Sequence, residues 1–179
     1  MTSLSSGTWL NEPRVWNADG DAVEVTTDHG TDFWRETHYG FTRDNGHFLA
    51  FAARGNFTAQ LRVCARYQRL YDQAGIELSD GRAMLSSVLT DGRSDWATAP
   101  YAGNANEFWM RATVAHGVLR LQVSADGRQW PLVRLAPFPI AASYQVGPMC
   151  CTPERAGLHV RFSDFELGPA AGKELHDLS

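Results

Sequence analysis

The sequence predicts an all-β fold, a two-sheet antiparallel sandwich, and three observations carry this prediction. Apolar and polar residues alternate with a period of two along most of the chain, as in strands that bury one face. Turn-forming Asp-Gly and Asn-Gly dipeptides separate the alternating stretches, at 19–20, 45–46, 80–81, 91–92 and 126–127. No segment shows a sustained helical period with capping residues at its ends. About nine or ten short strands at such regular spacing are typical of a sandwich.

The expected strands follow one another along the whole chain. Residues 56–67 are the clearest, because the odd-numbered residues are apolar or aromatic and their even-numbered neighbours are mainly polar. A hairpin joins 107–115 to 118–124, since His116-Gly117 between them suits a two-residue turn. The other expected strands are short apolar or alternating stretches at 22–26, 47–53, 84–90, 130–135, 144–151 and 158–167.

The length of 179 residues fits one domain. A core of this size buries roughly 70% of the surface that the unfolded chain exposes, so the fold needs no stapling by disulfides or metals. We place the sandwich domain at 1–169 and a loosely held extension at 170–179, because the alternation stops there. Within that extension, 170–178 is the best candidate for a helix.

Charge and cysteine content limit the class of partner and the location. Sixteen Lys and Arg face twenty Asp and Glu, a net charge of −4, whereas binders of nucleic acid or anionic membrane carry surplus positive charge. No stretch approaches the roughly 20 apolar residues of a membrane span. The first residues lack the features of a secretory signal, and three cysteines, two of them adjacent, fit reduced thiols. We therefore expect a cytoplasmic protein without nucleic-acid or membrane partners.

Residues 26–48 (TTDHGTDFWRETHYGFTRDNGHF) mix aromatic rings and charged groups more densely than any other stretch. Aromatic faces stack on the CH groups of sugars, while carboxylates, amides and arginine bind sugar hydroxyls. One interpretation is a carbohydrate or polyol site. The other is a hairpin whose polar groups satisfy loop backbone while Phe33, Trp34 and Phe41 enter the core.

Candidate binding residues also lie outside this stretch. Trp109 and Arg111 share one face of an expected strand and offer a ring beside a guanidinium, and Trp96 follows another strand where it could rim a groove. The candidate ligand-binding residues are Trp34, Glu36, His38, Tyr39, Asp44, His47, Tyr71, Asp72, Gln73, Trp96, Trp109 and Arg111.

The sequence supports a metal site or a catalytic site less well than a binding site. His29, His38 and His47 are nine residues apart, which on one strand would alternate between faces, so we expect no metal and no cofactor. A glycoside hydrolase needs two carboxyls about 5–5.5 Å or 6.5–9.5 Å apart, for which Glu36 with Asp72, or Asp32 with Glu36, are candidates. No nucleophile elbow, phosphate loop or dinucleotide motif occurs. The sequence therefore favours a binding protein over an enzyme.

Several longer stretches resemble the DUF1349 family of concanavalin A-like β-sandwich proteins, whose members include one described as a regulator of enolase. They are WLNEP with Trp16 (9–16), TDFWRETHYGF (31–41), DNGHF (44–48), LYDQAG (70–75), SSVLTDGRSDW (86–96), FWMR (108–111), SADGRQW (124–130) and FSDFELGP (162–169). The resemblance implies a jelly roll, a fold whose concave sheet binds sugars in lectins and glucanases. In the family a further hairpin usually follows YDQAG, whereas here Ile76 follows Gly75 directly, which would alter the groove beside Tyr71–Gln73.

Three functions follow from this combination of residues and resemblance. The first is binding of a carbohydrate or polyol in a concave aromatic and polar groove. The second, which rests on the family description, is a cytosolic interaction module that regulates a metabolic protein partner. The third is a glycan hydrolase that uses Glu36 and Asp72 as acid and base.

Overall fold

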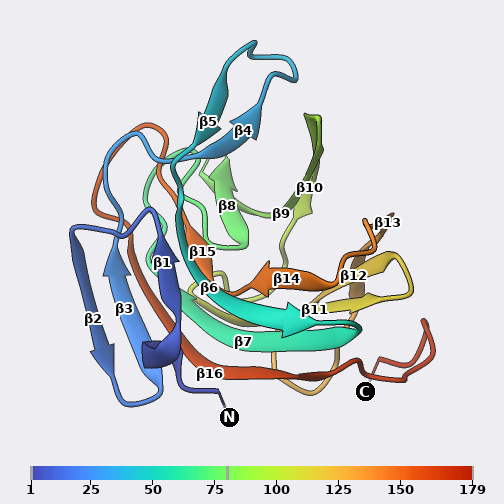
Figure 1. Cartoon of the computed structure of the whole chain (residues 1–179). Helices are drawn as coiled ribbons and strands as arrows, with labels where there is room; N and C mark the ends of the chain where they lie inside the picture. The colour runs from blue at the N-terminus through green and yellow to red at the C-terminus, as the bar shows by residue number, and fades with distance from the viewer. Residues whose placement is uncertain (1, 80, 179) are drawn as a thin grey trace.

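The computed structural model describes residues 2–79 and 81–178, which form β-strands joined by turns and one 3-10 turn, η1 (Leu4–Ser6). Two sheets face each other, and two smaller sheets stand at one end of them (Figure 1). All strand pairs are antiparallel. The predicted all-β sandwich is therefore confirmed.

The larger sheet has seven strands, and its central strand β7 (Phe57–Ala65) alternates along most of its length between buried and half-buried positions. In spatial order its strands are β13 (Leu132–Pro137), β12 (Val118–Ser124), β11 (Glu107–Ala115), β7 (Phe57–Ala65), β16 (His159–Pro169), β3 (Ala22–Thr26) and β2 (Val15–Asp19). In β7 the odd-numbered residues Phe57, Ala59, Val63 and Ala65 are buried, as the sequence predicts. The β11–β12 turn at His116-Gly117 has positive φ at both residues, which suits a tight hairpin.

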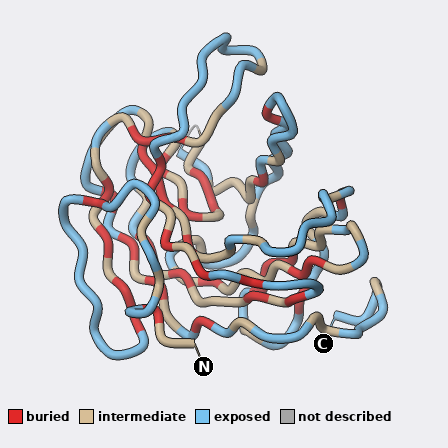
Figure 2. The backbone as a smooth tube through the Cα atoms, viewed as in Figure 1, coloured by how far each residue is buried: buried red, intermediate tan, exposed pale blue. Residues whose placement is uncertain are grey.

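The facing sheet is built around one strand, β6 (His47–Arg54). It pairs with β1 (Thr8–Leu10) on one edge and with β14 (Ser143–Val146) and β15 (Met149–Cys150) on the other. Its buried residues Leu49, Phe51 and Ala53 pack toward the larger sheet, and the ring of Phe51 lies 4.6 Å from that of Phe165 on β16. Burial is concentrated between these two sheets (Figure 2).

The two small sheets extend the facing sheet beyond the core. One contains β8 (Ile76–Ser79), β9 (Arg82–Asp91) and β10 (Arg93–Pro100), and the other is the hairpin of β4 (Phe33–Arg35) and β5 (Thr42–Asp44). Gln73 connects the former to β15, because it bridges both Cys151 and Glu77. The β4–β5 hairpin and the β9–β10 hairpin stand apart from the body and are largely exposed (Figures 1 and 2).

The C-terminal residues form no helix, which contradicts the helix candidate at 170–178. The chain there is held along the larger sheet by backbone groups. Ala171 N–H donates to Thr58 Oγ1 at 2.9 Å, Arg120 donates to the Lys173 carbonyl at 2.9 Å, and Trp130 N–H donates to the Leu178 carbonyl at 2.7 Å. A nine-residue segment is too short for a stable helix without a packed apolar face.

Candidate functional site

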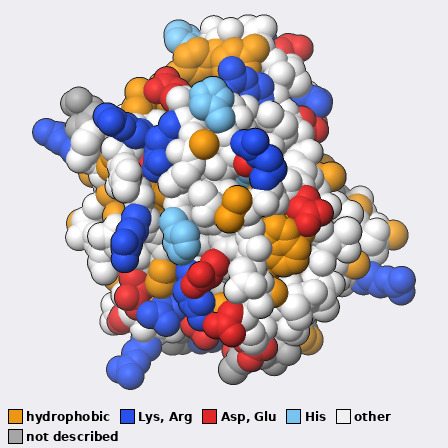
Figure 3. Space-filling model, turned by 90° about the vertical axis from the view of Figure 1, so that its left-hand side faces the viewer, with side chains coloured by type: hydrophobic (Ala, Val, Ile, Leu, Met, Phe, Trp, Pro, Cys, Tyr) orange, Lys and Arg blue, Asp and Glu red, His pale blue; other side chains and the backbone are white. Residues whose placement is uncertain are grey.

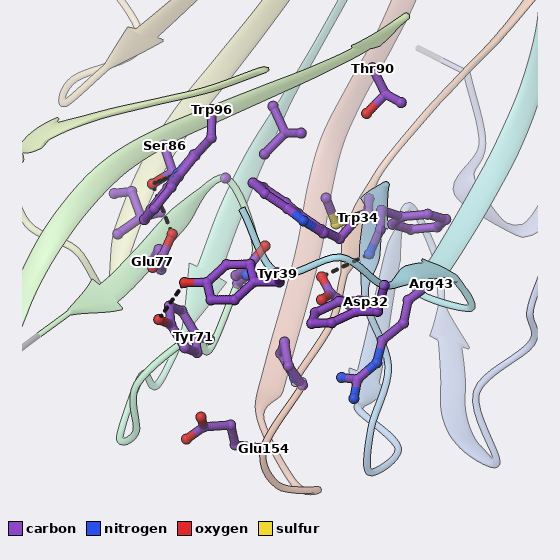
Figure 4. Close-up of a pocket in the computed structure, with 18 residues that line it drawn as sticks. Asp32, Trp34, Tyr39, Arg43, Tyr71, Glu77, Ser86, Thr90, Trp96 and Glu154 are labelled. Atoms are coloured by element: carbon purple, nitrogen blue, oxygen red, sulfur yellow. Dashed lines mark hydrogen bonds between the residues drawn. The ribbon is translucent and has the colours of Figure 1, made fainter. Parts of the chain in front are cut away.

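A cavity of about 480 Å³ lies between the β4–β5 hairpin and the β8–β9–β10 sheet (Figure 4). Its walls come from these two small sheets, and its remaining surface comes from 71–77 and 149–154. The lining residues are Asp32, Phe33, Trp34, Tyr39, Phe41, Arg43, Tyr71, Gln73, Gly75, Ile76, Glu77, Ser86, Val88, Thr90, Trp96, Met149, Pro153 and Glu154. The volume is that of a small-molecule site.

Three aromatic side chains form one connected cluster in the cavity wall. The rings of Trp34 and Trp96 meet edge to face with centroids 6.3 Å apart, and those of Trp34 and Tyr39 do so at 5.7 Å. Trp34 Nε1 donates to the Thr37 carbonyl at 2.9 Å, which fixes the indole orientation. The cluster therefore presents ring surface in a defined geometry.

The β4–β5 turn places Tyr39 in this cluster. Glu36 and His38 have positive φ angles of 58° and 63°, and Gly40 follows at 68°. The Glu36 N–H donates to the Phe41 carbonyl at 2.7 Å and the Gly40 N–H donates to the Glu36 carbonyl at 2.8 Å, so the turn closes on itself. These conformations are uncommon for residues other than glycine, and they direct the chain back over the cavity.

Two hydrogen bonds tie the hairpin to the rest of the cavity. Arg35 N–H donates to Ser94 Oγ on β10 at 2.9 Å. On the opposite side the hydroxyls of Tyr39 and Tyr71 hydrogen-bond at 3.2 Å, and this bond, together with burial, raises the pKa of Tyr71 to about 12. The hairpin is thereby held against both β10 and the segment that precedes β8.

Two carboxyl groups line the cavity deep below the rings. Glu77 on β8 is 2% exposed; Ser86 Oγ donates to its Oε2 at 3.0 Å, and its Oε1 has no partner among the described residues. Asp32, just before β4, is 8% exposed, and its Oδ1 accepts the Phe33 N–H at 2.8 Å. Burial raises the pKa of both carboxyls, and the charge of Asp32 raises that of Glu77 further.

The cavity brings together five of the twelve candidate binding residues. They are Trp34, Tyr39, Tyr71, Gln73 and Trp96. These five come from β4, the hairpin turn, the segment before β8, and β10. Trp34 lines the cavity and is not part of the core, contrary to the alternative interpretation of 26–48. The side chains of Asp32 and Asn45 do satisfy loop backbone, as that alternative expects.

Three candidates lie on the outside of the β4–β5 hairpin. Glu36, His38 and Asp44 are exposed and do not line the cavity. The Glu36 carboxylate lies 3.7 Å from Arg93 in an ion pair between two exposed side chains. Hydrophobic side chains gather at the end of the molecule where this hairpin stands, whereas charges of both signs are interspersed over the face below it (Figure 3).

His47 and Asp72 hold the structure together from buried positions. His47 Nε2 accepts the Asp28 N–H at 3.0 Å and its Nδ1 bonds the Asn11 carbonyl at 2.7 Å, so both ring nitrogens are occupied, whereas His29 and His38 are exposed. The fully buried Asp72 accepts two hydrogen bonds from Arg155, one of them from Nε at 2.8 Å. Glu36 and Asp72 therefore do not face each other across an open groove as an acid–base pair requires.

Trp109 and Arg111 belong to the opposite face of the larger sheet. On β11 they alternate with Phe108 and Met110, which pack in or against the core. The guanidinium of Arg62 lies 5.4 Å from the Trp109 ring, and that of Arg111 lies 3.7 Å from the ring of the buried Trp130. Trp109 and Arg111 therefore each form a ring–guanidinium contact with another residue, not with one another, and both lie away from the cavity.

Sequence reasoning missed Glu77 and considered Asp32 only as a partner of Glu36. A signal for Glu77 exists, because it stands between Ile76 and Leu78 and therefore points to the opposite face of its strand. The register places Met84 beside Glu77 on the neighbouring strand, and Ser86 two residues further on that same face. The convergence of this face with the hairpin is a long-range property that alternation does not encode.

Comparisons with known proteins agree with the sequence resemblance. The family model described as a protein of unknown function (DUF1349) matches residues 9–170. Regulation of enolase protein 1 from Saccharomyces cerevisiae is 58% identical over an aligned length of 192 residues, and the alignment covers 99% of this chain and 97% of that protein. Since this chain has 179 residues, the relative contains residues that are missing here.

Solved structures show the same architecture. A functionally unknown protein from Saccharomyces cerevisiae superposes with a TM-score of 0.93 at 57% identity, over 96% of this chain and 100% of the other. The GH43 protein BlXynB from Bacillus licheniformis gives a TM-score of 0.57 at 12% identity, over 94% of this chain and 39% of the other, which shows the fold alone.

Proposed function

The chain belongs to the DUF1349 family, and from this premise we propose that it binds a small carbohydrate or polyol in the aromatic cavity. One observation carries the proposal: Trp34 and Tyr39 from the hairpin, Tyr71 from the segment before β8, and Trp96 from β10 converge on one space of about 480 Å³. Rings that converge from distant segments without filling the space between them are suited to a ligand rather than to the core.

The polar groups of the cavity suit hydroxylated ligands. The Gln73 amide, the hydroxyls of Ser86 and Thr90, and the carboxyls of Asp32 and Glu77 line the same space as the rings. An indole would stack on a face of the sugar ring, while these polar groups would form hydrogen bonds with the hydroxyls around its edge. The function proposed is binding, with no reaction assigned to these residues.

A fluorescence titration tests the proposal, since Trp34 and Trp96 are in the cavity wall. The probes are a panel of neutral and amino monosaccharides and linear polyols, added to the wild-type chain. Trp96→Ala should weaken binding of any hit by about tenfold or more, because it removes a stacking surface. Trp109→Ala is the matched control, since Trp109 lies on the larger sheet away from the cavity, and it should leave the affinity unchanged. Absence of a response to every probe would overturn the proposal.

A regulatory function is the second candidate, and the 58% identical relative supports it through its name, Regulation of enolase protein 1. We propose that this chain acts in the same process through a protein partner. Replacing the gene of that relative in Saccharomyces cerevisiae with this chain, and measuring enolase activity and abundance, tests the proposal. Restoration of the enolase phenotype of the deletion strain is expected, and failure by a stably expressed chain would overturn it.

A cytoplasmic location is part of this second proposal. All three cysteines are free, and the described residues contain no helix long and apolar enough to span a bilayer. Free thiols fit a reducing compartment. Cell fractionation of the tagged chain should recover it with cytosolic markers, and recovery with membranes or the medium would contradict this location.

A further inference from the structure

The proposed sugar or polyol site has an electrostatic property that narrows its ligand class. Resting on that proposed function, we infer that the ligand carries a cationic nitrogen, as an amino sugar or another polyhydroxylated amine does, and that Glu77 and Asp32 bind its ammonium group. The inference depends on an unpartnered buried oxygen, on the balance of charges around the cavity, and on the surrounding rings.

The unpartnered oxygen is Oε1 of Glu77. Only 2% of this residue is exposed, and its other carboxyl oxygen accepts the Ser86 hydroxyl at 3.0 Å. Buried carboxylate oxygens nearly always have a donor, because an unpaired one loses its hydration without compensation. Since Glu77 lines the cavity, a donor on the bound ligand is the partner that this oxygen lacks.

The charges around the cavity call for a positive group. Its lining contains three acidic side chains, Asp32, Glu77 and Glu154, and one basic one, Arg43. The Arg43 guanidinium lies 4.8 Å from the centroid of the Phe41 ring and is exposed. Its charge acts on Asp32, whereas Ser86 and Asp32 are the described groups that act on Glu77. A neutral sugar would therefore leave the Glu77 carboxylate without a counter-charge.

The rings add to the attraction for a cation. An ammonium over the face of tryptophan or tyrosine is stabilised by the negative ring face, most of all where water is excluded. In the view of Figure 4, Glu77 and Asp32 lie on either side of the Tyr39 ring, with Trp96 and Trp34 above them. An amine in this space would contact carboxylate oxygens and ring faces at once, while its hydroxyls reach Gln73 and Thr90.

Matched probes separate the contribution of the ligand's positive charge to binding from that of its sugar ring. D-glucosamine, D-glucose and N-acetyl-D-glucosamine share one ring and differ in whether the nitrogen is present and charged. Isothermal titration at neutral pH should show glucosamine binding at least tenfold more tightly than the other two. Ethanolamine, which has an ammonium group and a single hydroxyl, separates the cation from the polyol.

Isosteric variants locate the charge. Glu77→Gln and Asp32→Asn retain the acceptors for Ser86 and for the Phe33 N–H, so the fold should be kept, which thermal melting verifies. Each should weaken the binding of glucosamine about tenfold more than it weakens the binding of glucose. Glu166→Gln is the control, because it removes the same charge from an exposed position on β16.

The possible outcomes distinguish failure of the cationic ligand class from failure of the proposed polyol function. Preference for glucosamine that both variants abolish supports the inference. Equal binding of glucosamine and glucose overturns it and leaves the proposed polyol function standing. Binding of ethanolamine but of no sugar supports the ammonium site and overturns the polyol function, and binding of none of the four probes counts against both.

Discussion

The larger sheet and the β4–β5 hairpin of the cavity wall are both built from antiparallel strands, but they are held by different interactions. In the larger sheet, long neighbouring strands share eight or more paired positions, and its inward side chains are almost fully buried. In the cavity wall, β4 and β5 share three paired positions, and the hairpin depends on side-chain bonds to Ser94 and Tyr71. The first region is stabilised by burial, whereas the second is positioned by a few specific contacts.

This difference shows where stability and function are separable in the molecule. Inward residues of the larger sheet contact one another, so removing one leaves a void between two sheets. Residues of the cavity wall face the open cavity on one side, so substituting one should affect ligand affinity more than the stability of the fold. The following predictions test this separation.

The largest effect is expected from the core. Phe162→Ala on β16 removes a ring that is 2% exposed and should lower the free energy of unfolding by about 3–5 kcal/mol. Chemical denaturation measures this loss. Where the variant remains folded, its affinity for a ligand of the cavity should stay within twofold of the wild type, and a larger change would show that core and cavity are coupled.

Glu77→Gln should instead raise the free energy of unfolding at neutral pH. Burial raises the pKa of this carboxyl, so the folded state binds its proton more tightly than the unfolded state does. That contribution is fully present below the unfolded pKa of about 4.3 and is lost as pH rises through the raised folded pKa. The variant lacks the buried charge and should therefore be more stable at neutral pH by about 1–3 kcal/mol.

Thermal melting across pH checks this sign. The advantage of Glu77→Gln should shrink as pH falls and disappear below about pH 3.5, where the wild-type carboxyl is protonated in both states. Glu166→Gln, at an exposed position, should show no such dependence. A Glu77→Gln variant that is less stable at neutral pH would mean that the carboxylate already has a partner in the unliganded protein.

A smaller effect is expected from the bond that closes the hairpin. Tyr39→Phe removes its hydroxyl contact with Tyr71 and should cost about 0.5–1.5 kcal/mol. Because this bond is the largest cause of the raised Tyr71 pKa of about 12, Tyr71 should then titrate closer to its ordinary value of about 10. Absorbance titration of the tyrosines measures the shift, and an unchanged Tyr71 pKa would contradict the bond.

The same contrast explains how much of the molecule the sequence could predict. Alternation places Phe57, Val63 and their neighbours in the core, because each strand faces one apolar layer throughout its length. It also predicts the His116-Gly117 hairpin, whose geometry is local. The ring clusters are found only in part: composition suggests Trp34 and Tyr39, but nothing local distinguishes Trp96, inside the cavity, from Trp109 on the far sheet.

The carboxyl candidates failed to converge for a related reason. Asp72 stands in a segment rich in polar and aromatic residues, and its partner Arg155 is 83 residues away in the chain. Glu36 adopts a left-handed conformation in a turn, so strand alternation does not predict the direction of its side chain. Glu77, in contrast, follows strand alternation, but its significance depends on the hairpin that covers it.

Glu36→Gln should therefore have the smallest effect of all. Its ion pair with Arg93 joins two exposed side chains at 3.7 Å, and such pairs contribute about 0–1 kcal/mol. Unfolding free energy should change by no more than about 0.5 kcal/mol, and the affinity for a ligand of the cavity by less than twofold. Isothermal titration of Glu36→Gln and of Glu77→Gln compares how much each carboxylate contributes to ligand affinity, one on the exposed hairpin turn and one in the cavity. A loss of binding in Glu36→Gln that equals that of Glu77→Gln would extend the site to the outer turn, and the distinction between cavity wall and exposed hairpin would no longer hold.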